Sequence, residues 1–158
     1  MKGNPEVVST LNQLLAEELT AINQYMVHSE MSDNWGYARL HKAIERIAID
    51  EMKHAEKIIG RVLFLEGLPI VSKLNPLKIG KDVNGIIASD LEGEHDAIAS
   101  YNKAVAQAAE LRDAGTRELL EHILADEERH LDFHEAQRDQ VEQMGLSQFL
   151  ANQTREKD

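Results

Sequence analysis

The feature that most restricts the fold of this chain is a short motif that occurs twice at a fixed separation. Residues 51–54 read Glu-Met-Lys-His and residues 127–130 read Glu-Glu-Arg-His, so each residue of the second copy lies 76 positions after its counterpart in the first. The same offset relates Glu18 to Glu94, and each of these glutamates precedes its motif by 33 positions. The chain is therefore predicted to contain two copies of one structural unit.

The first copy of the motif lies on an otherwise apolar stripe. Residues at spacings of three and four form this stripe, which comprises Ile44, Ile47, Glu51, His54, Ile58, Val62 and Leu65. Such spacing is typical of one face of a long helix. A carboxylate and an imidazole that point into a core need partners, and other carboxylates around a metal would supply them. From this segment alone, a salt-bridged core pair, or a stripe with a solvent-exposed edge at Glu51, remains an alternative.

The repeat extends beyond the polar residues. The 76-residue offset also pairs Leu15 with Leu91, Ile22 with Ile98, Tyr25 with Tyr101, Ile44 with Leu120 and Ile47 with Ile123. Each half is therefore predicted to be a helical hairpin, with one inward glutamate on its first helix and Glu-x-x-His on its second. Six polar groups would then meet at one level of a bundle.

Composition limits the class of protein. The chain has 158 residues, 42% hydrophobic and 28% charged, which predicts one soluble domain over residues 1–158. No apolar run is long enough to cross a membrane, the N-terminus has no apolar signal stretch, and there is no cysteine, so a cytoplasmic protein is expected. A net charge of −11 disfavours binding to nucleic acid.

The hydrophobic periodicity predicts an all-α, four-helix bundle with helices at approximately 5–33, 36–66, 82–111 and 116–144, and a short fifth helix at 146–153. Thr116 is the predicted cap of the fourth helix. Residues 68–81 contain two prolines and no helical period. Extended at about 3.3 Å per residue, they would span roughly 46 Å, the length of a 30-residue helix, and would place the third helix parallel to the second. Leu146, Phe149 and Leu150 are expected to pack either on their own subunit or on another.

The six polar residues form a complete ligand set for two metal ions. They are Glu18, Glu51, His54, Glu94, Glu127 and His130. Their composition resembles that of the ferritin-like di-iron and di-manganese carboxylate bundles. Four carboxylates balance two divalent ions, with Glu51 and Glu127 as bridges and one Glu–His pair for each ion. Oxygen-rich ligands suit iron or manganese, although ligand type alone leaves zinc open.

Other polar residues near the stripes are given no ligand role. Glu92 and His95 also form Glu-x-x-His, but the offset partner of Glu92 is Ala16. Four further residues are predicted to be solvated or to lie at the surface or beside a channel: Glu17, Glu128, His122 and His134. Tyr25 and Tyr101 are predicted to be core residues whose hydroxyls bind a ligand carboxylate, and electron donation to an oxidised centre is the alternative.

The chain resembles the bacterioferritins over nearly its whole length. The resemblance rests on the runs 1–3 (Met-Lys-Gly), 23–25 (Asn-Gln-Tyr), 34–36 (Asn-Trp-Gly), 49–55 (Ile-Asp-Glu-Met-Lys-His-Ala), 64–69 (Phe-Leu-Glu-Gly-Leu-Pro) and 144–146 (Met-Gly-Leu). It implies a hollow shell of 24 subunits that oxidises Fe(II) at a di-iron ferroxidase centre, with O2 or H2O2 as oxidant, and stores ferric mineral. The same six Glu and His residues would be the ferroxidase ligands.

The resemblance also gives Met52 a role. Periodicity places Met52 on a lateral helix face as a packing methionine. Bacterioferritins bind haem b between two-fold-related subunits through one methionine from each, and Met52 stands in that motif. This implies a homo-oligomer of haem-bridged dimers, with a small ferredoxin as the electron donor for iron release.

Arg46 is a departure from those members that place a histidine before the conserved aspartate. It puts an inner-surface iron site near Asp50 in doubt, and Asp50 is expected to pair with Arg46 or Lys53 instead. The function expected is iron storage with ferroxidase activity. The alternatives are a non-storing di-metal oxidase or peroxidase, and a haem-binding carrier or shell subunit with an idle metal centre.

Overall fold

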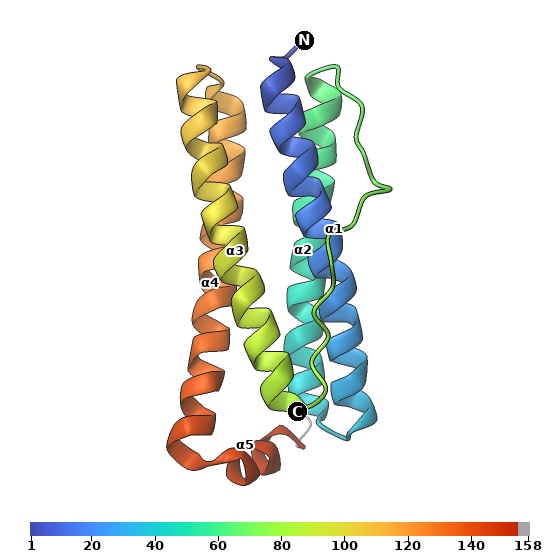
Figure 1. Cartoon of the computed structure of the whole chain (residues 1–158), viewed down its shortest axis with the longest axis vertical. Coiled ribbons are helices and arrows are strands. Elements are labelled where there is room, and N and C mark those ends of the chain that lie inside the picture. The colour runs from blue at the N-terminus through green and yellow to red at the C-terminus, as the bar shows by residue number, and fades with distance from the viewer. Residues whose placement is uncertain (155–158) are drawn as a thin grey trace.

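The computed structural model describes residues 1–154, and the last four residues of the predicted domain lie outside this range. Four long helices and one short helix form this part of the chain: α1 (Pro5–Asn34), α2 (Ala38–Phe64), α3 (Val83–Glu110), α4 (Ala114–Met144) and α5 (Leu146–Gln153). In Figure 1, α1 and α2 run antiparallel, as do α3 and α4, while α3 is parallel to α2. The predicted all-α four-helix bundle is confirmed, and the described residues contain no strand.

Acidic or amide side chains fix the starts of three long helices. Asn4 precedes Pro5 and accepts a hydrogen bond of 2.8 Å from the backbone N–H of Glu6, which satisfies a donor that the first turn leaves free. Asp82 caps α3 in the same way through the N–H of Gly85, at 2.8 Å.

The cap of α4 differs from the prediction. Thr116 is not the cap. Asp113 holds that position and accepts from the Thr116 backbone N–H at 3.0 Å and from its hydroxyl at 2.6 Å. Arg61 of α2 reaches across to Asp113 at 2.7 Å, so this cap also ties the two hairpins together. A Cβ at Gly115 would lie 2.8 Å from the Arg61 guanidinium, so a larger residue there would displace this side chain.

The segment between α2 and α3 (residues 65–82), called the crossover below, runs the length of the bundle beside α1 (Figure 1). Four of its backbone N–H groups donate to polar side chains on one face of α1: Ile70 to Asn12 Oδ1 (2.8 Å), Asn75 to Thr20 Oγ1 (2.8 Å), Lys78 to Gln24 Oε1 (3.0 Å) and Gly80 to His28 Nε2 (2.9 Å). These acceptors hold an extended chain in place without a neighbouring strand. At Gly80 the chain passes so close to α3 that a Cβ would lie 2.2 Å from the backbone nitrogen of Ile86.

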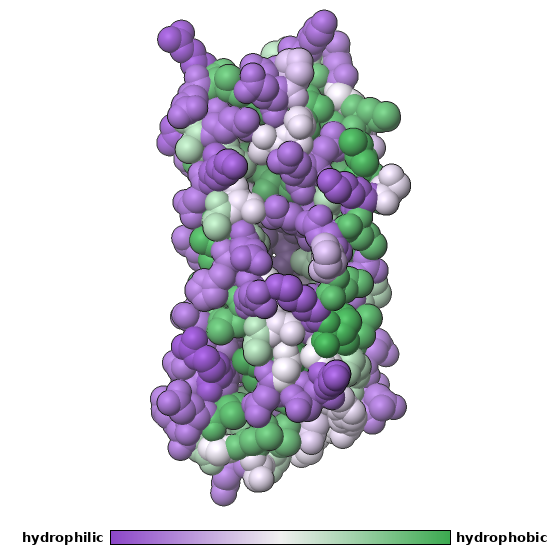
Figure 2. Space-filling model, in the orientation of Figure 1, coloured by the Kyte–Doolittle hydropathy of each residue, from purple (hydrophilic) through white to green (hydrophobic). Residues whose placement is uncertain are grey.

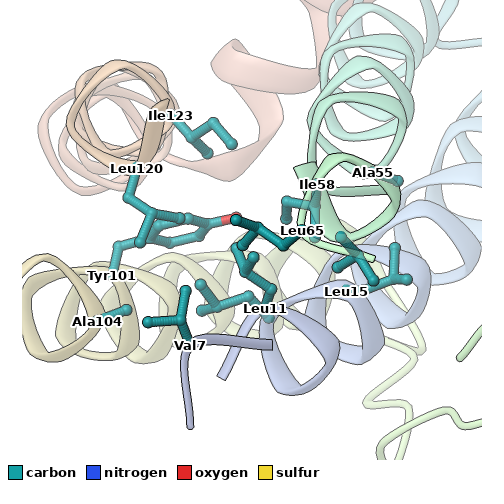
Figure 3. Close-up of a cluster of buried hydrophobic side chains, with 12 residues drawn as sticks. Val7, Leu11, Leu15, Ala55, Ile58, Leu65, Tyr101, Ala104, Leu120 and Ile123 are labelled. Carbon is teal, nitrogen blue, oxygen red and sulfur yellow. The ribbon is translucent and has the colours of Figure 1, made fainter. Parts of the chain in front are cut away.

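Two hydrophobic clusters lie on either side of the polar level. Side chains from all four long helices form the first cluster, as Figure 3 shows for members such as Leu11, Ile58, Tyr101 and Leu120. The second cluster lies toward α5 and includes Leu40, Ile44, Ile86 and Phe149. The apolar residues on both sides limit the access of water to the polar groups from either end of the bundle.

The apolar side of α5 packs on its own chain. Phe149 is 1% exposed within the second cluster and Leu150 is partly buried against it. Leu146 remains 36% exposed, so only part of the predicted apolar surface is covered within the subunit.

None of the helices in residues 1–154 has the length and apolar character needed to cross a membrane.

Candidate metal centre

The structure brings all six predicted residues together at one level of the bundle. Helices α1 and α3 each contribute one glutamate, and α2 and α4 each contribute a glutamate and a histidine one turn apart. All six residues are buried, with exposures of 5% or less. They form two groups whose ligand atoms lie within 4.8 Å of one another: Glu18, Glu51, His54 and Glu127 in one, and Glu51, Glu94, Glu127 and His130 in the other. Glu51 and Glu127 belong to both groups, as two bridging carboxylates would.

Both histidines present Nδ1 to the carboxylates. His54 Nδ1 lies 3.0 Å from Glu51 and 3.1 Å from Glu127. His130 Nδ1 lies 3.2 Å from Glu51 and 3.3 Å from Glu127. The shared contacts place each imidazole nitrogen where it could bind a metal together with the bridging carboxylates.

The carboxylates control the protonation of the imidazoles. Burial lowers the pKa of His54, but hydrogen bonds to Glu127, Glu18 and Glu51 outweigh it and raise that pKa far above its usual value. Burial also opposes protonation of His130, whose pKa is nevertheless raised to about 11 by Glu127 and Glu51. Conversely, burial raises the pKa of Glu127, but the two imidazoles outweigh it and lower that pKa to about 2. Without metal, the imidazoles therefore carry protons that neutralise part of the carboxylate charge.

The two terminal glutamates respond differently. Burial, followed by repulsion from Glu51, raises the pKa of Glu18 and Glu94 well above the usual value. Tyr101 donates a hydrogen bond to Glu18, and Tyr25 donates one to Glu94. Burial raises the pKa of both phenols well above 10, so they stay protonated and remain donors. The predicted bonds from these tyrosines to the candidate ligand carboxylates are confirmed.

The two halves of the repeat differ beside Tyr25, which contacts a histidine that the other half lacks. His134 is 1% exposed, its Nε2 lies 2.9 Å from the Tyr25 hydroxyl and the two rings stack. Burial lowers the pKa of His134 to about 4, which keeps it neutral and allows Nε2–H to donate to Tyr25. The expected surface position for His134 is therefore wrong. Ile58 occupies its place in the other half, so Tyr101 has no matching histidine.

The other excluded residues are placed as follows. Glu128 and His122 are exposed, as predicted, and His95 is exposed as well. Glu17 is only half-buried and accepts a hydrogen bond of 3.0 Å from Ser100, so the prediction that it is solvated holds only in part. Asp50 pairs with Lys53 at 3.3 Å, one of the two pairings expected for it.

Two buried titratable residues were missed by sequence reasoning. His28 and Asp90 are both 0% exposed, and His28 Nδ1 donates to Asp90 Oδ1 at 2.8 Å while Nε2 accepts from the crossover. His28 lies three residues after Tyr25, and Asp90 lies four before Glu94, so helical spacing could have found them. Comparison of the halves concealed them because their offset partners, Ala104 and Leu14, are apolar.

A cavity of about 280 Å³ leads from the surface toward the polar level, between α1 and α3 and beside the crossover segment. Its lining includes Glu17, Gln24 and Asp96 as well as Glu18 and Glu94 of the cluster. Figure 2 shows this face of the molecule hollowed near its middle. Such a volume holds several water molecules, so hydrated ions and small oxidants can approach.

Met52 lies outside the cluster. Its neighbour Glu51 is 2% exposed, whereas Met52 is 46% exposed, and Ile49 on the same side of α2 is 41% exposed. The lateral position inferred from helical geometry is therefore observed.

Comparisons with known proteins agree with this arrangement. The ferritin-like domain family matches residues 8–144. The bacterioferritin of Brucella melitensis is 42% identical over 149 residues, covering 94% of this chain and 92% of the relative. The bacterioferritin of Rhodobacter capsulatus is 43% identical with the same coverage, and that of Mycobacterium avium is 40% identical over 96% of this chain and 95% of the relative. The chain therefore belongs to the ferritin-like family and, within it, to the bacterioferritins.

Proposed function

We propose that this protein is an iron-storage ferroxidase that oxidises Fe(II) to Fe(III) at the six-residue centre and stores ferric mineral in a shell of 24 subunits. The observation that carries the proposal is the pair of overlapping ligand groups that share Glu51 and Glu127. Kinship with proteins named bacterioferritin supports the storage role.

The residues fit two divalent cations. Four buried carboxyl groups and two imidazoles match the ligand count of a dinuclear site, and four carboxylates balance two ions of charge +2. Within residues 1–154, the buried Glu18 Oε2 accepts no hydrogen bond and lies 3.5 Å from His54 Nδ1, so this ligand oxygen is left to accept a cation. A metal pair would also remove the repulsion that raises the pKa of Glu18 and Glu94.

Each side chain has a distinct task in this proposal. Glu51 and Glu127 would bridge the ions, while Glu18 with His54, and Glu94 with His130, would complete the two positions. The bound iron pair supplies the electrons that reduce the oxidant. Tyr101 and Tyr25 hold the terminal glutamates in place through one oxygen each. The apolar clusters on both sides keep bulk water away from the carboxylates at the two ends of the bundle, which strengthens the attraction between the carboxylates and the cations.

The substrates are Fe(II) and either O2 or H2O2, and the cavity between α1 and α3 is the proposed approach route. Its lining of Glu17 and Asp96 beside the cluster suits a cation, and its volume also admits either oxidant. The proposed place of action is the cytoplasm, and that location stays a prediction.

Stopped-flow absorbance after addition of two Fe(II) per subunit to the apo-protein tests the ferroxidase proposal. We expect a fast phase that saturates near two irons per subunit and is lost in Glu18→Ala and Glu127→Ala. Glu128→Ala is the matched control, because that residue neighbours Glu127 but is exposed. If the control loses the fast phase as well, or the ligand variants keep it, the assignment of the centre is wrong.

Light scattering on the same samples tests storage. A particle of roughly 24 subunits supports it. A fast phase on a dimer would leave an oxidase without storage, and a full shell with no fast phase would favour a shell subunit with an idle centre.

We further propose that Met52 is an axial ligand of haem b between two-fold-related subunits, and that this haem takes electrons from a small ferredoxin to reduce stored iron. The 46% exposure of Met52, next to exposed Ile49, supports the proposal because both would gain cover from an apolar ring on that face. Haem titration followed by visible absorbance should saturate at one haem per two subunits. Met52→Leu should abolish bis-methionine ligation, whereas Met144→Leu, at another exposed methionine, should not.

A further inference from the structure

The internal repeat includes the residues just outside the ligand set. Asp50 and Lys53 lie in the first motif, and the 76-residue offset relates them to Asp126 and Arg129 in the second. Each copy therefore reads Asp-Glu-x-basic-His. The aspartate of each copy faces the histidine of the other copy across the bundle. An aspartate behind a metal-binding histidine orients the ring and makes its other nitrogen a better ligand.

Of the two aspartate–histidine contacts, the one between Asp126 and His54 is a hydrogen bond. Asp126 Oδ2 lies 3.0 Å from His54 Nε2, and the Asp126 side chain is 24% exposed. Arg129 donates to the other carboxylate oxygen and fixes its orientation. His54 thus has Nδ1 directed at the candidate metal position and Nε2 anchored from behind.

The equivalent pair, Asp50 and His130, does not form a hydrogen bond. Asp50 Oδ2 lies 3.6 Å from His130 Nε2, beyond hydrogen-bond distance, and Asp50 is 40% exposed. Its other oxygen faces Lys53, which is 58% exposed, at 3.3 Å. Among the described residues, His130 Nε2 is buried without any hydrogen-bond partner. His130 is therefore less firmly oriented than His54.

We propose that the two metal positions are unequal, with the Glu18–His54 position the tighter one and Asp126 the positioning residue that makes it so. The inference rests on the proposed function, since it concerns the same centre. The repeat matches the ligands themselves, with the same bridges, one terminal glutamate and one tyrosine donor on each side. The two halves differ in the distance from the aspartate to the histidine Nε2, which is 3.0 Å at His54 and 3.6 Å at His130.

A second difference acts in the same direction. His134 contacts the Tyr25 hydroxyl at 2.9 Å, and Tyr25 donates to Glu94. Donation by His134 polarises the phenol and strengthens its bond to Glu94, which draws electron density from that ligand. The offset partner of His134 is Ile58, so Tyr101, which donates to Glu18, has no matching histidine. The Glu94–His130 position is therefore the weaker and more readily emptied one.

Anaerobic titration with Co(II), followed by visible absorbance and calorimetry, tests the inequality without any oxidation step. Glu94→Ala leaves the position beside His54, and Glu18→Ala leaves the position beside His130. We expect the first variant to bind one Co(II) about 10- to 100-fold more tightly than the second. The wild-type protein should then fill in two steps, with distinct absorbance for each.

A matched pair of aspartate variants tests the positioning role of Asp126. Asp126→Asn in the Glu94→Ala protein should weaken Co(II) binding by about 10- to 100-fold, whereas Asp50→Asn in the Glu18→Ala protein should weaken it by less than about threefold. Circular dichroism confirms that each variant is folded. A merely structural role for Asp126 would lower thermal stability without changing the Co(II) spectrum.

Equal affinities in the two single-position variants, or equal losses in the two aspartate variants, would overturn the inference. Rapid Fe(II) oxidation with equal Co(II) affinities would leave the proposed function intact and reject only the inequality. Stepwise Co(II) binding without Fe(II) oxidation would support the inequality of the two positions and reject the proposed ferroxidase function. A wild-type protein that binds no Co(II) would reject both.

Discussion

Loading the apo-protein with two divalent ions at neutral pH should release protons from the centre. Both imidazoles must give up their Nδ1 proton, and every carboxyl ligand must be ionised before it binds a metal. Burial opposes a proton on His130, but its carboxylate neighbours raise its pKa to about 11, and that of His54 is raised further. Burial and the repulsion from Glu51 also raise the pKa of Glu18 and Glu94 well above the usual value.

The structure sets the size of the effect. The two imidazoles supply two protons, and the two terminal glutamates supply up to two more. Each proton released raises the overall metal-binding constant tenfold per pH unit, or about 1.4 kcal/mol. Metal binding should thus strengthen by about 2.7 to 5.4 kcal/mol per pH unit as the pH rises. The slope should fall from the upper toward the lower value once the pH exceeds the pKa of Glu18 and Glu94.

A weakly buffered solution with a pH indicator measures this directly under anaerobic conditions, with Co(II) or Fe(II) added in steps. Glu128→Gln is the control, because that exposed residue lies beside the centre without contributing to it. Repeating the titration between about pH 6 and 9 gives the slope. Release of fewer than about one proton per metal pair would refute the idea that the imidazoles are protonated in the apo-protein.

Three further predictions concern stability. Burial lowers the pKa of His134 in the folded protein to about 4, whereas in the unfolded chain this histidine takes up a proton near pH 6.5. The free energy of unfolding should therefore decrease by about 3 kcal/mol between pH 6.5 and pH 4. A urea series in which His134→Gln keeps the same pH dependence as wild type would contradict this. Tyr25→Phe should cost about 1–3 kcal/mol more than Tyr101→Phe, because only the first leaves a buried histidine N–H without its partner. Equal thermal shifts for the two would count against it. Gly80→Ala should destabilise by about 1–3 kcal/mol through its backbone clash, whereas Gly60→Ala, in open space on a helix, should stabilise by up to about 1 kcal/mol, as thermal unfolding of both would show.

The fold and the candidate ligands were predictable because two independent copies of the sequence agree. One Glu-x-x-His on a helix has several explanations, but a second copy at the same offset, with Glu18 and Glu94 at matched distances, leaves few arrangements that bury so many charges. The long crossover was equally predictable, since a proline-containing segment of that length reaches along a helix of 30 residues. Helical periodicity and the energetic cost of buried charge are both local properties of the sequence.

Residues without a repeat partner were harder to place. Asp90, His28 and His134 extend the inward stripes by one turn, yet each is matched by an apolar residue in the other half, so comparison of the halves directed attention away from them. The cap of α4 was misassigned for a related reason. Asp113 and Thr116 are both acceptable caps, and the choice between them depends on Arg61 arriving from another helix.

The sequence by itself determined which residues share a face, how many helices form and which six groups meet. Only the tertiary structure decided that Asp126 reaches His54 at 3.0 Å while Asp50 stops 3.6 Å short of His130. The two motifs are nearly identical as sequence, so no local rule separates them. The difference arises from how the two hairpins pack against each other, because a shift of less than 1 Å makes or breaks a hydrogen bond although it leaves the helical pattern unchanged.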